Sequence, residues 1–363
     1  MNNERRVGFI VGELGKGGQE RQLLYLLEEL NKQGHNTALI IWNYKPKMKA
    51  YLEQPGVHQS KILRLEKESR FVKLIKVRKF LNVNHITSIQ SFSFYLNFYL
   101  FLICLFKKLK PIGAIRNRLM MMYTSQSNLS FWLCSIFPSR KISNNRDYRS
   151  GFDSLIIRCF YAKTEIVFNH LNIDNFEYSF PDNENTIRTA SIGRLYPEKS
   201  IDTIIRVINE LKQAGYNVKH QHAGGGPLLN GLQALLQDSG LMDSFEFVGE
   251  LEDISSFLKD KHVLIHSSIF EGFPNVLMEA MACGKPIVST DCGDARHLVR
   301  TQINGFIVDV NDVDALVKSL ITLILNQQLM VSFSEAGRRL AEENFNLTTL
   351  VDQTFQAYDR LKV

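Results

Sequence analysis

The sequence predicts an α/β protein made of two doubly wound, Rossmann-like domains that face each other across a cleft. Its 363 residues suffice for two domains of ordinary size, each with its own core. Continuous apolar strands alternate with amphipathic helical segments, which is typical of a parallel sheet covered on both faces. The alternation is interrupted at the polar segment 172–188 and then begins again. Ligands are expected where the carboxyl ends of the strands meet the cleft.

The first domain is expected over residues 1–175. It opens with the apolar strand 6–12, and a glycine-rich loop follows. The next segment, 20–34, has leucines at helical spacing and should stop at Gly34. A second strand is expected over 36–42, and later strands in the stretches "HITSIQ", "IGAIR" and "KISNN".

The second domain is expected over residues 176–345, after a linker rich in asparagine within 172–188. Its predicted strands lie in "TASIGRL", "NVKHQHAGGG", "SFEFVGE", "VLIHSS", "PIVST" and "GFIVD".

Charge is divided unevenly between the halves. Residues 1–180 hold 27 Lys and Arg against 13 Asp and Glu, whereas the whole chain has a net charge of +6. A basic first half suits an anionic partner such as a membrane surface, nucleic acid or a phosphorylated acceptor, although basic faces are often only solvated. The composition, 45% hydrophobic and 22% charged, is that of a globular protein and excludes a disordered chain.

The cysteines and one apolar run bear on location. Five cysteines form no CxxC pair, which favours a reducing, cytoplasmic compartment. The apolar run 92–106 is shorter than the roughly 20 residues that span a bilayer. Two alternatives remain for it: a core helix, or a face resting on lipid with the help of Lys107, Lys108 and Lys110.

The stretch 267–294, "SSIFEGFPNVLMEAMACGKPIVSTDCGD", concentrates the chemistry. A buried strand ends near Ser268, and Pro274 suits the first turn of a helix. The backbone N–H groups of Asn275, Val276 and Leu277 would then offer an anion site. Glu271 and Glu279 flank that site, and two carboxylates would repel a bare phosphate. A ligand that is part phosphate and part polyol, such as a sugar nucleotide, fits both features.

This stretch resembles the E-x7-E signature of retaining GT-B glycosyltransferases of family 4, the glycosyl transferases group 1. Four other segments resemble that family in the same order: "KGGQERQLLYLLEELNKQGH" (16–35), "EIVFNHLNIDNFE" (165–177), "SIGRLYPEKSIDTIIRVINEL" (191–211) and "HAGGGPL" (222–228). The resemblance covers nearly the whole chain. It implies a GT-B fold in which the final helix, within 346–363, returns to the first domain.

The resemblance also implies roles for individual residues. Arg194 and Lys199 would clamp the donor diphosphate and stabilise the leaving nucleoside diphosphate. Glu271 would bind hydroxyls of the transferred sugar, and Glu279 the ribose. The remaining residues of the implied donor site are Gly17, Gly18, Gly193, Val248, Gly249, Phe273, Pro274, Asn275, Val276 and Leu277.

Simpler alternatives stand beside these roles. Gly17 and Gly18 could serve only a tight turn, Arg194 and Lys199 could be surface charges, and Glu279 could be a solvated helix residue. The pair Asp312 and Asp314 is expected to cap a helix and not to hold a metal. The family chemistry implies no metal and no cofactor.

The acceptor side departs from the family pattern. Many relatives carry a histidine near the reacting sugar, whereas here Gln90, Arg116 or Asn117 stands in the corresponding stretches. Arg146 is a further candidate on this side. His297 and Gly225 also replace residues common in the family, Glu and Asp.

The resemblance therefore implies a metal-independent, retaining hexosyltransferase. It would move a sugar from a nucleoside diphosphate donor, UDP-linked, to a glycan or lipid-linked acceptor at the inner face of a bacterial membrane. A catalytically silent relative that binds nucleotide sugars as a scaffold is the alternative. A nicotinamide-dependent oxidoreductase and a Walker-loop ATPase are excluded because G-x-G-x-x-G and GK[ST] are missing. No nucleic acid partner is expected.

Overall fold

The computed structural model divides into two compact units. It describes residues 5–15, 17–54, 56–116, 119, 123, 127–146, 148, 161, 163–181 and 186–363. Unit 1 comprises Met1–His170 and Leu347–Val363, and unit 2 comprises Leu171–Asn346. The cleft expected between two domains stays a prediction.

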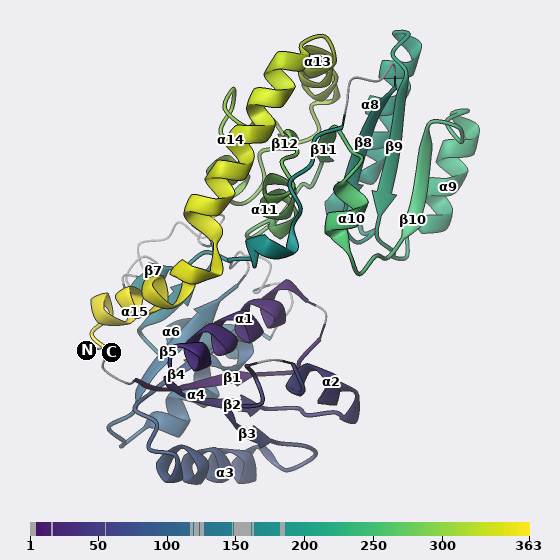
Figure 1. The fold of residues 1–363 in the computed structure, drawn as a ribbon. Coiled ribbons are helices and arrows are strands. Elements are labelled where there is room, and N and C mark those ends of the chain that lie inside the picture. The colour runs from purple at the N-terminus through teal and green to yellow at the C-terminus, as the bar shows by residue number, and fades with distance from the viewer. Residues whose placement is uncertain are drawn as a thin grey trace. The chain divides into compact units, whose positions relative to one another are not determined.

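Unit 1 is built on a parallel sheet that, in the described residues, has the strand order β3-β2-β1-β4-β5-β6-β7 (Figure 1). Its strands are β1 (Arg6–Val11), β2 (Asn36–Ile41), β3 (Lys61–Arg64), β4 (Ser88–Ser91), β5 (Lys110–Ile115), β6 (Lys141–Ser143) and β7 (Thr164–Ile166). The order reverses between β1 and β4. At such a switch point the loops diverge to opposite faces and leave room for a ligand.

Helices complete unit 1. They are α1 (Gly18–Lys32), α2 (Lys49–Leu52), α3 (Arg70–Val83), α4 (Asn97–Cys104), α6 (Asn128–Ile136) and α15 (Leu350–Arg360), with the short 3-10 turns η1 (Pro46–Met48), η2 (Phe94–Leu96) and η5 (Leu347–Thr349). α1 ends as expected, because Gly34 adopts a φ of +79° just beyond it. One core joins Phe9 of β1, Leu27 of α1 and Val351 of α15, all with no exposed surface.

The apolar run 92–106 is mostly a core element. It forms η2 and α4, in which Leu96, Leu100 and Ile103 have no exposed surface. Phe106 is the exception: it follows α4, has a φ of +62° and is 96% exposed. The core alternative is therefore confirmed for the helix itself.

Unit 2 repeats the plan with the strand order β10-β9-β8-β11-β12-β13 in its described part, again with every neighbouring pair parallel. Its strands are β8 (Ile187–Ile192), β9 (Val218–Ala223), β10 (Phe245–Gly249), β11 (Val263–His266), β12 (Ile287–Thr290) and β13 (Gly305–Val308). The switch point lies between β8 and β11.

The helices of unit 2 pack on this sheet. They are α8 (Ile201–Gln213), α9 (Leu229–Asp238), α10 (Ile254–Leu258), α11 (Asn275–Ala282), α12 (Ala295–Leu298), α13 (Val313–Ile324) and α14 (Gln327–Phe345), with the turns η3 (Ile173–Asn175) and η4 (Pro197–Lys199). The core combines α8 residues Ile204, Val207 and Ile208 with Leu316 and Leu320 of α13. The apolar residues of α8 recur every three to four positions. They therefore lie on one face of the helix, and that face packs against the neighbouring elements.

None of the described helices is long and apolar enough to cross a bilayer alone. Taken together, α13 and α14 have the length and composition of a membrane span, but they meet at a bend of 102°.

Candidate active site

Two loops at the switch point of unit 2 are joined into one surface. The first follows β8 and includes η4, and the second follows β11. The Ser267 hydroxyl donates to the carbonyls of Lys199 and Ser200, both at 2.9 Å, and the Ile269 N–H donates to the Glu198 carbonyl at 2.8 Å. These bonds fix the position of η4 relative to the second loop. Side chains of both loops are thereby brought within contact distance.

Lys199 and Glu271 are brought together by this arrangement. The Lys199 ammonium donates to Oε1 of Glu271, and the Ser268 hydroxyl donates to the same oxygen at 2.9 Å. The two charged side chains are only 17% and 16% exposed. Burial raises the pKa of Glu271, but Lys199 and the Ser268 hydroxyl together hold that pKa below its ordinary value. The carboxylate is therefore ionised at neutral pH, and Lys199 keeps further N–H groups for a ligand.

His266 lies beside Glu271 as a neutral imidazole. Its Nε2 is 3.6 Å from Oε1 of Glu271, and burial lowers the pKa of His266 to about 4. A neutral histidine adds no charge to the pair at pH 7.

Arg194 follows β8 but lies outside the pair. Its side chain is 70% exposed, 3.7 Å from Glu198 and 4.9 Å from the centre of the Tyr196 ring. The two predicted cations therefore lie in different surroundings. The Lys199 side chain is mostly buried, whereas the Arg194 side chain lies on the surface.

Gly193 lies against the glycine-rich turn after β9. The Gly193 N–H donates to the Ala223 carbonyl, and the Leu195 N–H donates to the Gly225 carbonyl, both at 2.9 Å. Gly224 has a φ of +145°, and a Cβ there would collide with the Gly193 carbonyl. Glycine is therefore required at 224 because the two loops approach so closely.

A buried hydrogen-bonded chain that sequence analysis missed ends at Gly193. Thr189 contacts Nδ1 of His220 at 2.8 Å, and the Ser191 hydroxyl lies 2.8 Å from Nε2 of His220 and 2.7 Å from Nδ1 of His222. Nε2 of His222 is 3.0 Å from the Gly193 carbonyl. This chain could have been predicted from the sequence. Thr189 and Ser191 are two residues apart on one strand, and His220 and His222 are two apart on its neighbour, so the four side chains share one face of the sheet.

α11 begins at Asn275, and Pro274 lies directly before it with a ψ of 91°. The Leu277 N–H donates to the Pro274 carbonyl at 3.1 Å, so it is not one of the open amides that were expected. The expectation of an anion site here now concerns Asn275 and Val276 only.

The remaining predicted donor residues of this region are well enclosed. Glu279 lies on α11 and is 5% exposed, which rules out the solvated-helix alternative. The Phe273 ring packs edge to face on Phe345, with centroids 5.9 Å apart.

At the end of β10 a bulge inserts Val248 between the pairs Phe247–His222 and Gly249–Ala223. The extra residue of such a bulge is left unpaired in the ladder.

In unit 1, Gly17 and Gly18 form the start of α1. Gly17 precedes the helix and Gly18 is its first residue. Gly17 lines a cavity of about 600 Å³ together with Glu13, Glu20 and Lys47. Burial raises the pKa of Glu20. The cavity wall thus carries two carboxyl groups and one ammonium group, which can hydrogen-bond to sugar hydroxyls.

The predicted acceptor-side residues lie at the carboxyl ends of β4, β5 and β6. Gln90, in β4, is buried and accepts a hydrogen bond from the Tyr358 hydroxyl of α15 at 2.7 Å. Arg116 follows β5, and its guanidinium lies 4.2 Å from the centre of the Phe92 ring. Arg146 follows β6 and lies 5.3 Å from the centre of the Phe168 ring. Asn117 lies outside the described residues.

No group of three or more His, Cys, Asp or Glu side chains that could hold a metal occurs in the described part of the chain. Asp312 caps α13, since its Oδ1 accepts a hydrogen bond from the Ala315 N–H at 2.9 Å. Its predicted capping role is confirmed, whereas independence from metal stays a prediction.

Comparison with known proteins finds one family model and several relatives that match part of the chain. Residues 172–340 match the family model described as glycosyl transferases group 1. An uncharacterized glycosyltransferase of Haemophilus influenzae is 30% identical over 166 residues, which make up 45% of this chain and 46% of that protein. The Escherichia coli UDP-Gal:alpha-D-GlcNAc-diphosphoundecaprenol alpha-1,3-galactosyltransferase is 25% identical over 183 residues, 48% of this chain and 46% of that protein. The matches span about half the length of these curated relatives.

A solved structure matches over a greater length. Anabaena HepE in complex with UDP has a TM-score of 0.83 and 19% identity, over 98% of this chain and 99% of that chain. The two Rossmann-like units of this chain therefore have the GT-B fold.

Proposed function

We propose that this chain is a group 1 glycosyltransferase, the family whose model matches residues 172–340, and that it transfers a sugar from a UDP-linked donor to a glycan acceptor with retention of configuration. The contact between Lys199 and Glu271 carries the proposal. It sets a cation for the diphosphate beside an ionised carboxylate for sugar hydroxyls, at the edge of a parallel sheet where ligands of this fold class bind.

The donor is held in the proposal by unit 2. Lys199 donates to the diphosphate with the N–H groups that Glu271 does not use, and Arg194 swings in from the surface to the same group. Glu271 accepts from hydroxyls of the sugar and Glu279 from those of the ribose. The Escherichia coli relative is named for the donor UDP-Gal, which supports UDP as the nucleotide to test first.

The transfer step needs no separate base. The bond from the anomeric carbon to the diphosphate oxygen breaks, and the acceptor oxygen bonds to that carbon on the same face. The acceptor proton passes to the departing phosphate oxygen. Lys199 and Arg194 stabilise the charge that builds on the diphosphate, in place of a metal ion.

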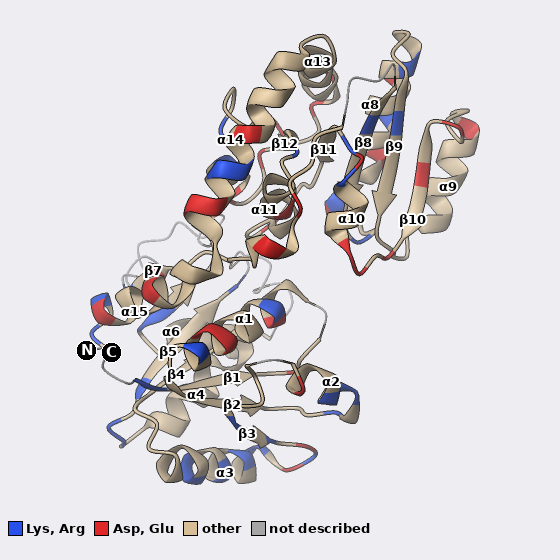
Figure 2. Cartoon of the chain, viewed as in Figure 1, with Lys and Arg blue, Asp and Glu red and all other residues tan. Residues whose placement is uncertain are grey.

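The acceptor is proposed to be a lipid-linked glycan precursor at the cytoplasmic face of a membrane. α3 of unit 1 supports this part of the proposal. Phe71 is 71% and Ile75 52% exposed on this helix, and exposed Arg70, Lys76 and Lys79 accompany them. Figure 2 shows the Lys and Arg positions along α3. Exposed aromatic and aliphatic side chains among cations are suited to an anionic lipid surface.

Calorimetric titration with UDP, followed by assay of UDP-sugar hydrolysis, tests the proposal. The wild-type protein should bind UDP and release it slowly from a UDP-hexose in water. Binding without turnover on any UDP-sugar, with or without lipid-linked acceptors, would instead favour a silent nucleotide-sugar-binding scaffold. Absence of UDP binding would refute the donor assignment.

A further inference from the structure

The buried hydrogen-bonded chain of unit 2 ends at the loop that carries the two predicted cations. Its members Thr189, Ser191, His220 and His222 are each at most 2% exposed. They come from β8 and β9, which are parallel neighbours (Figure 1), so hydroxyl and imidazole groups alternate along the hydrogen-bonded chain. Its last atom, Nε2 of His222, lies 3.0 Å from the Gly193 carbonyl.

The Gly193 carbonyl fixes the tautomer of His222. A carbonyl oxygen can only accept, so Nε2 of His222 carries a hydrogen and donates it. Burial lowers the pKa of His222 to about 4, so the ring is neutral at pH 7 and its Nδ1 has no hydrogen. The Ser191 hydroxyl lies 2.7 Å from that Nδ1 and must therefore donate to it.

The same reasoning sets the direction of the other bonds. Because the Ser191 hydroxyl uses its one hydrogen for His222, its oxygen accepts from Nε2 of His220 at 2.8 Å. Burial lowers the pKa of His220 well below its ordinary value, so this ring is neutral too. Its Nδ1 then accepts from the Thr189 hydroxyl at 2.8 Å. Every donor thus points towards Gly193, and hydrogen bonds aligned in this way strengthen one another.

The position of Gly193 affects Lys199. The Lys199 stem passes over Gly193, since a Cβ at this glycine would lie 3.6 Å from Cδ of Lys199. The Lys199 ammonium is also close enough to lower the pKa of His222 further. On the other side, a Cβ at Gly224 would collide with the Gly193 carbonyl. A shift of Gly193 would therefore displace the lysine that is expected to bind the diphosphate.

The Gly193 carbonyl also sets the direction of the next N–H. The peptide bond between Gly193 and Arg194 is trans, so the Arg194 N–H points away from His222. This N–H has no hydrogen-bond partner within the described part of the chain, whereas the Leu195 N–H donates to the Gly225 carbonyl at 2.9 Å. The peptide that His222 orients thus keeps one N–H for a ligand.

We propose that His222 is a positioning residue of the donor site, which holds the loop of Arg194 and Lys199 by donating to the Gly193 carbonyl. Ser191 keeps His222 in the tautomer that can donate. With its hydrogen on Nδ1 instead, the ring would turn a lone pair towards the carbonyl and repel it. The inference rests on the proposed function, since it explains how the groups that would bind the donor diphosphate are kept in place.

Two substitutions separate the two ring nitrogens. His222→Gln brings an amide N–H close to the position of Nε2 and can keep the bond to Gly193, whereas the shorter His222→Asn has its amide at the level of Nδ1 and loses that bond. Calorimetric titration with UDP should show roughly tenfold weaker binding for His222→Asn, because its loop is no longer held in the binding geometry. His222→Gln should bind UDP nearly as wild type does.

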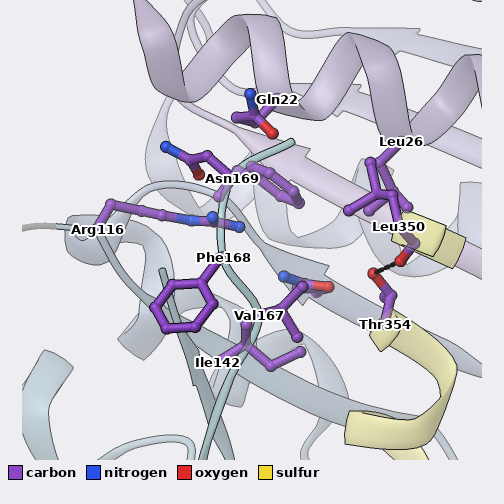
Figure 3. Close-up of a pocket in the computed structure, with 11 residues that line it drawn as sticks. Gln22, Leu26, Arg116, Ile142, Val167, Phe168, Asn169, Leu350 and Thr354 are labelled. Carbon is purple, nitrogen blue, oxygen red and sulfur yellow. Dashed lines mark hydrogen bonds between the residues drawn. The ribbon is translucent and has the colours of Figure 1, made fainter. Parts of the chain in front are cut away.

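Thr354→Val is the control for the loss of a buried hydrogen bond. The Thr354 hydroxyl donates to the Leu350 carbonyl at 2.8 Å in unit 1 (Figure 3). This variant and His222→Asn should both unfold at a lower urea concentration than wild type, but only His222→Asn should bind UDP more weakly. A merely structural His222 predicts equal UDP affinity for His222→Asn and His222→Gln. That result, or equal weakening in Thr354→Val, would overturn the proposal.

NMR of the histidine ring nitrogens tests the tautomer in the wild-type protein without a ligand. We expect the hydrogen of His222 on Nε2, and a hydrogen on Nδ1 would overturn the proposal even where a variant does not fold. The amide signal of Arg194 reports on the loop: it should move in His222→Asn and stay near its wild-type position in His222→Gln. Wild-type protein that does not bind UDP would refute the donor assignment, while these two NMR measurements would still decide whether His222 holds the loop.

Discussion

The Lys199 ammonium contacts the carboxylate of Glu271, although 72 residues separate them. The group expected to bind the diphosphate and the group expected to bind the sugar are thus held by one another. Each of the two side chains fixes the rotamer of the other. Less side-chain entropy is therefore lost when a donor binds.

Lys199→Ala should lower donor affinity or turnover at least tenfold, which is about 1.4 kcal/mol. The loss of a charge-assisted hydrogen bond to the diphosphate is the reason. Calorimetry with UDP and the initial rate of transfer measure it. Lys212→Ala, an exposed lysine on α8, is the control. Binding equal to wild type would remove Lys199 from the site.

Glu279→Ala should have an effect of similar size, at least tenfold, but for a different reason. The ribose hydroxyls lose their acceptor, so the weaker binding should also be seen with UDP and not with inorganic pyrophosphate. If both ligands weaken equally, the change disturbs α11 as a whole.

Glu271→Gln should lower the free energy of unfolding by about 2 kcal/mol, between the values for exposed and fully buried ion pairs. This substitution removes the negative partner and leaves the Lys199 ammonium charged in a mostly buried position. Urea unfolding measures the change, and Glu198→Gln, whose partner Arg194 is 70% exposed, serves as the matched control. The double change Glu271→Gln with Lys199→Met should cost less than the two single changes added together. Strict additivity would contradict the coupling.

Stability should fall as the pH drops from about 6.5 towards 4. Burial lowers the pKa of His170, His222 and His266 to about 4, whereas in an unfolded chain it is near 6.5. The unfolded state therefore binds more protons in this window, and stability present above pH 6.5 is lost on acidification. On the order of 2 kcal/mol per histidine should be lost between pH 7 and pH 5. Urea unfolding at both values tests this: His170→Gln should show a shallower dependence, and the exposed His58→Gln should match wild type.

Replacing Phe71 and Ile75 of α3 by serine should reduce recovery of the protein with anionic vesicles. Neutral vesicles should recover little of either protein. Leu325→Ser removes a side chain that is 72% exposed in unit 2 and controls for general loss of apolar surface. Equal recovery of wild type on neutral and anionic vesicles would refute the membrane assignment.

Much of the fold could be predicted from the sequence because its strands are continuous apolar runs bounded by glycine and polar residues. Strands such as Arg6–Val11 and Asn36–Ile41 lie where the pattern predicts them. Since parallel strands all end at one edge, the loops that carry Gly193, Lys199 and Glu271 could also be placed there.

The contacts between those loops could not be predicted. Which atom Lys199 reaches depends on its long side chain and on the hydroxyl of Ser267, which donates a hydrogen bond to η4 from the loop after β11. The bond from Tyr358 to Gln90 links residues 268 positions apart, and no local pattern encodes such a pair.

The return of α15 to unit 1 has a consequence for synthesis. Unit 2 occupies one continuous stretch, Leu171–Asn346, and can close its core as soon as that stretch has left the ribosome. Unit 1 begins first, yet its interior lacks Val351 and Tyr358 until the last helix emerges. Unit 1 is thus the first unit to be translated and the last to complete its core. Until then the nascent chain exposes the apolar surface that α15 later covers, and chaperones recognise surfaces of this kind.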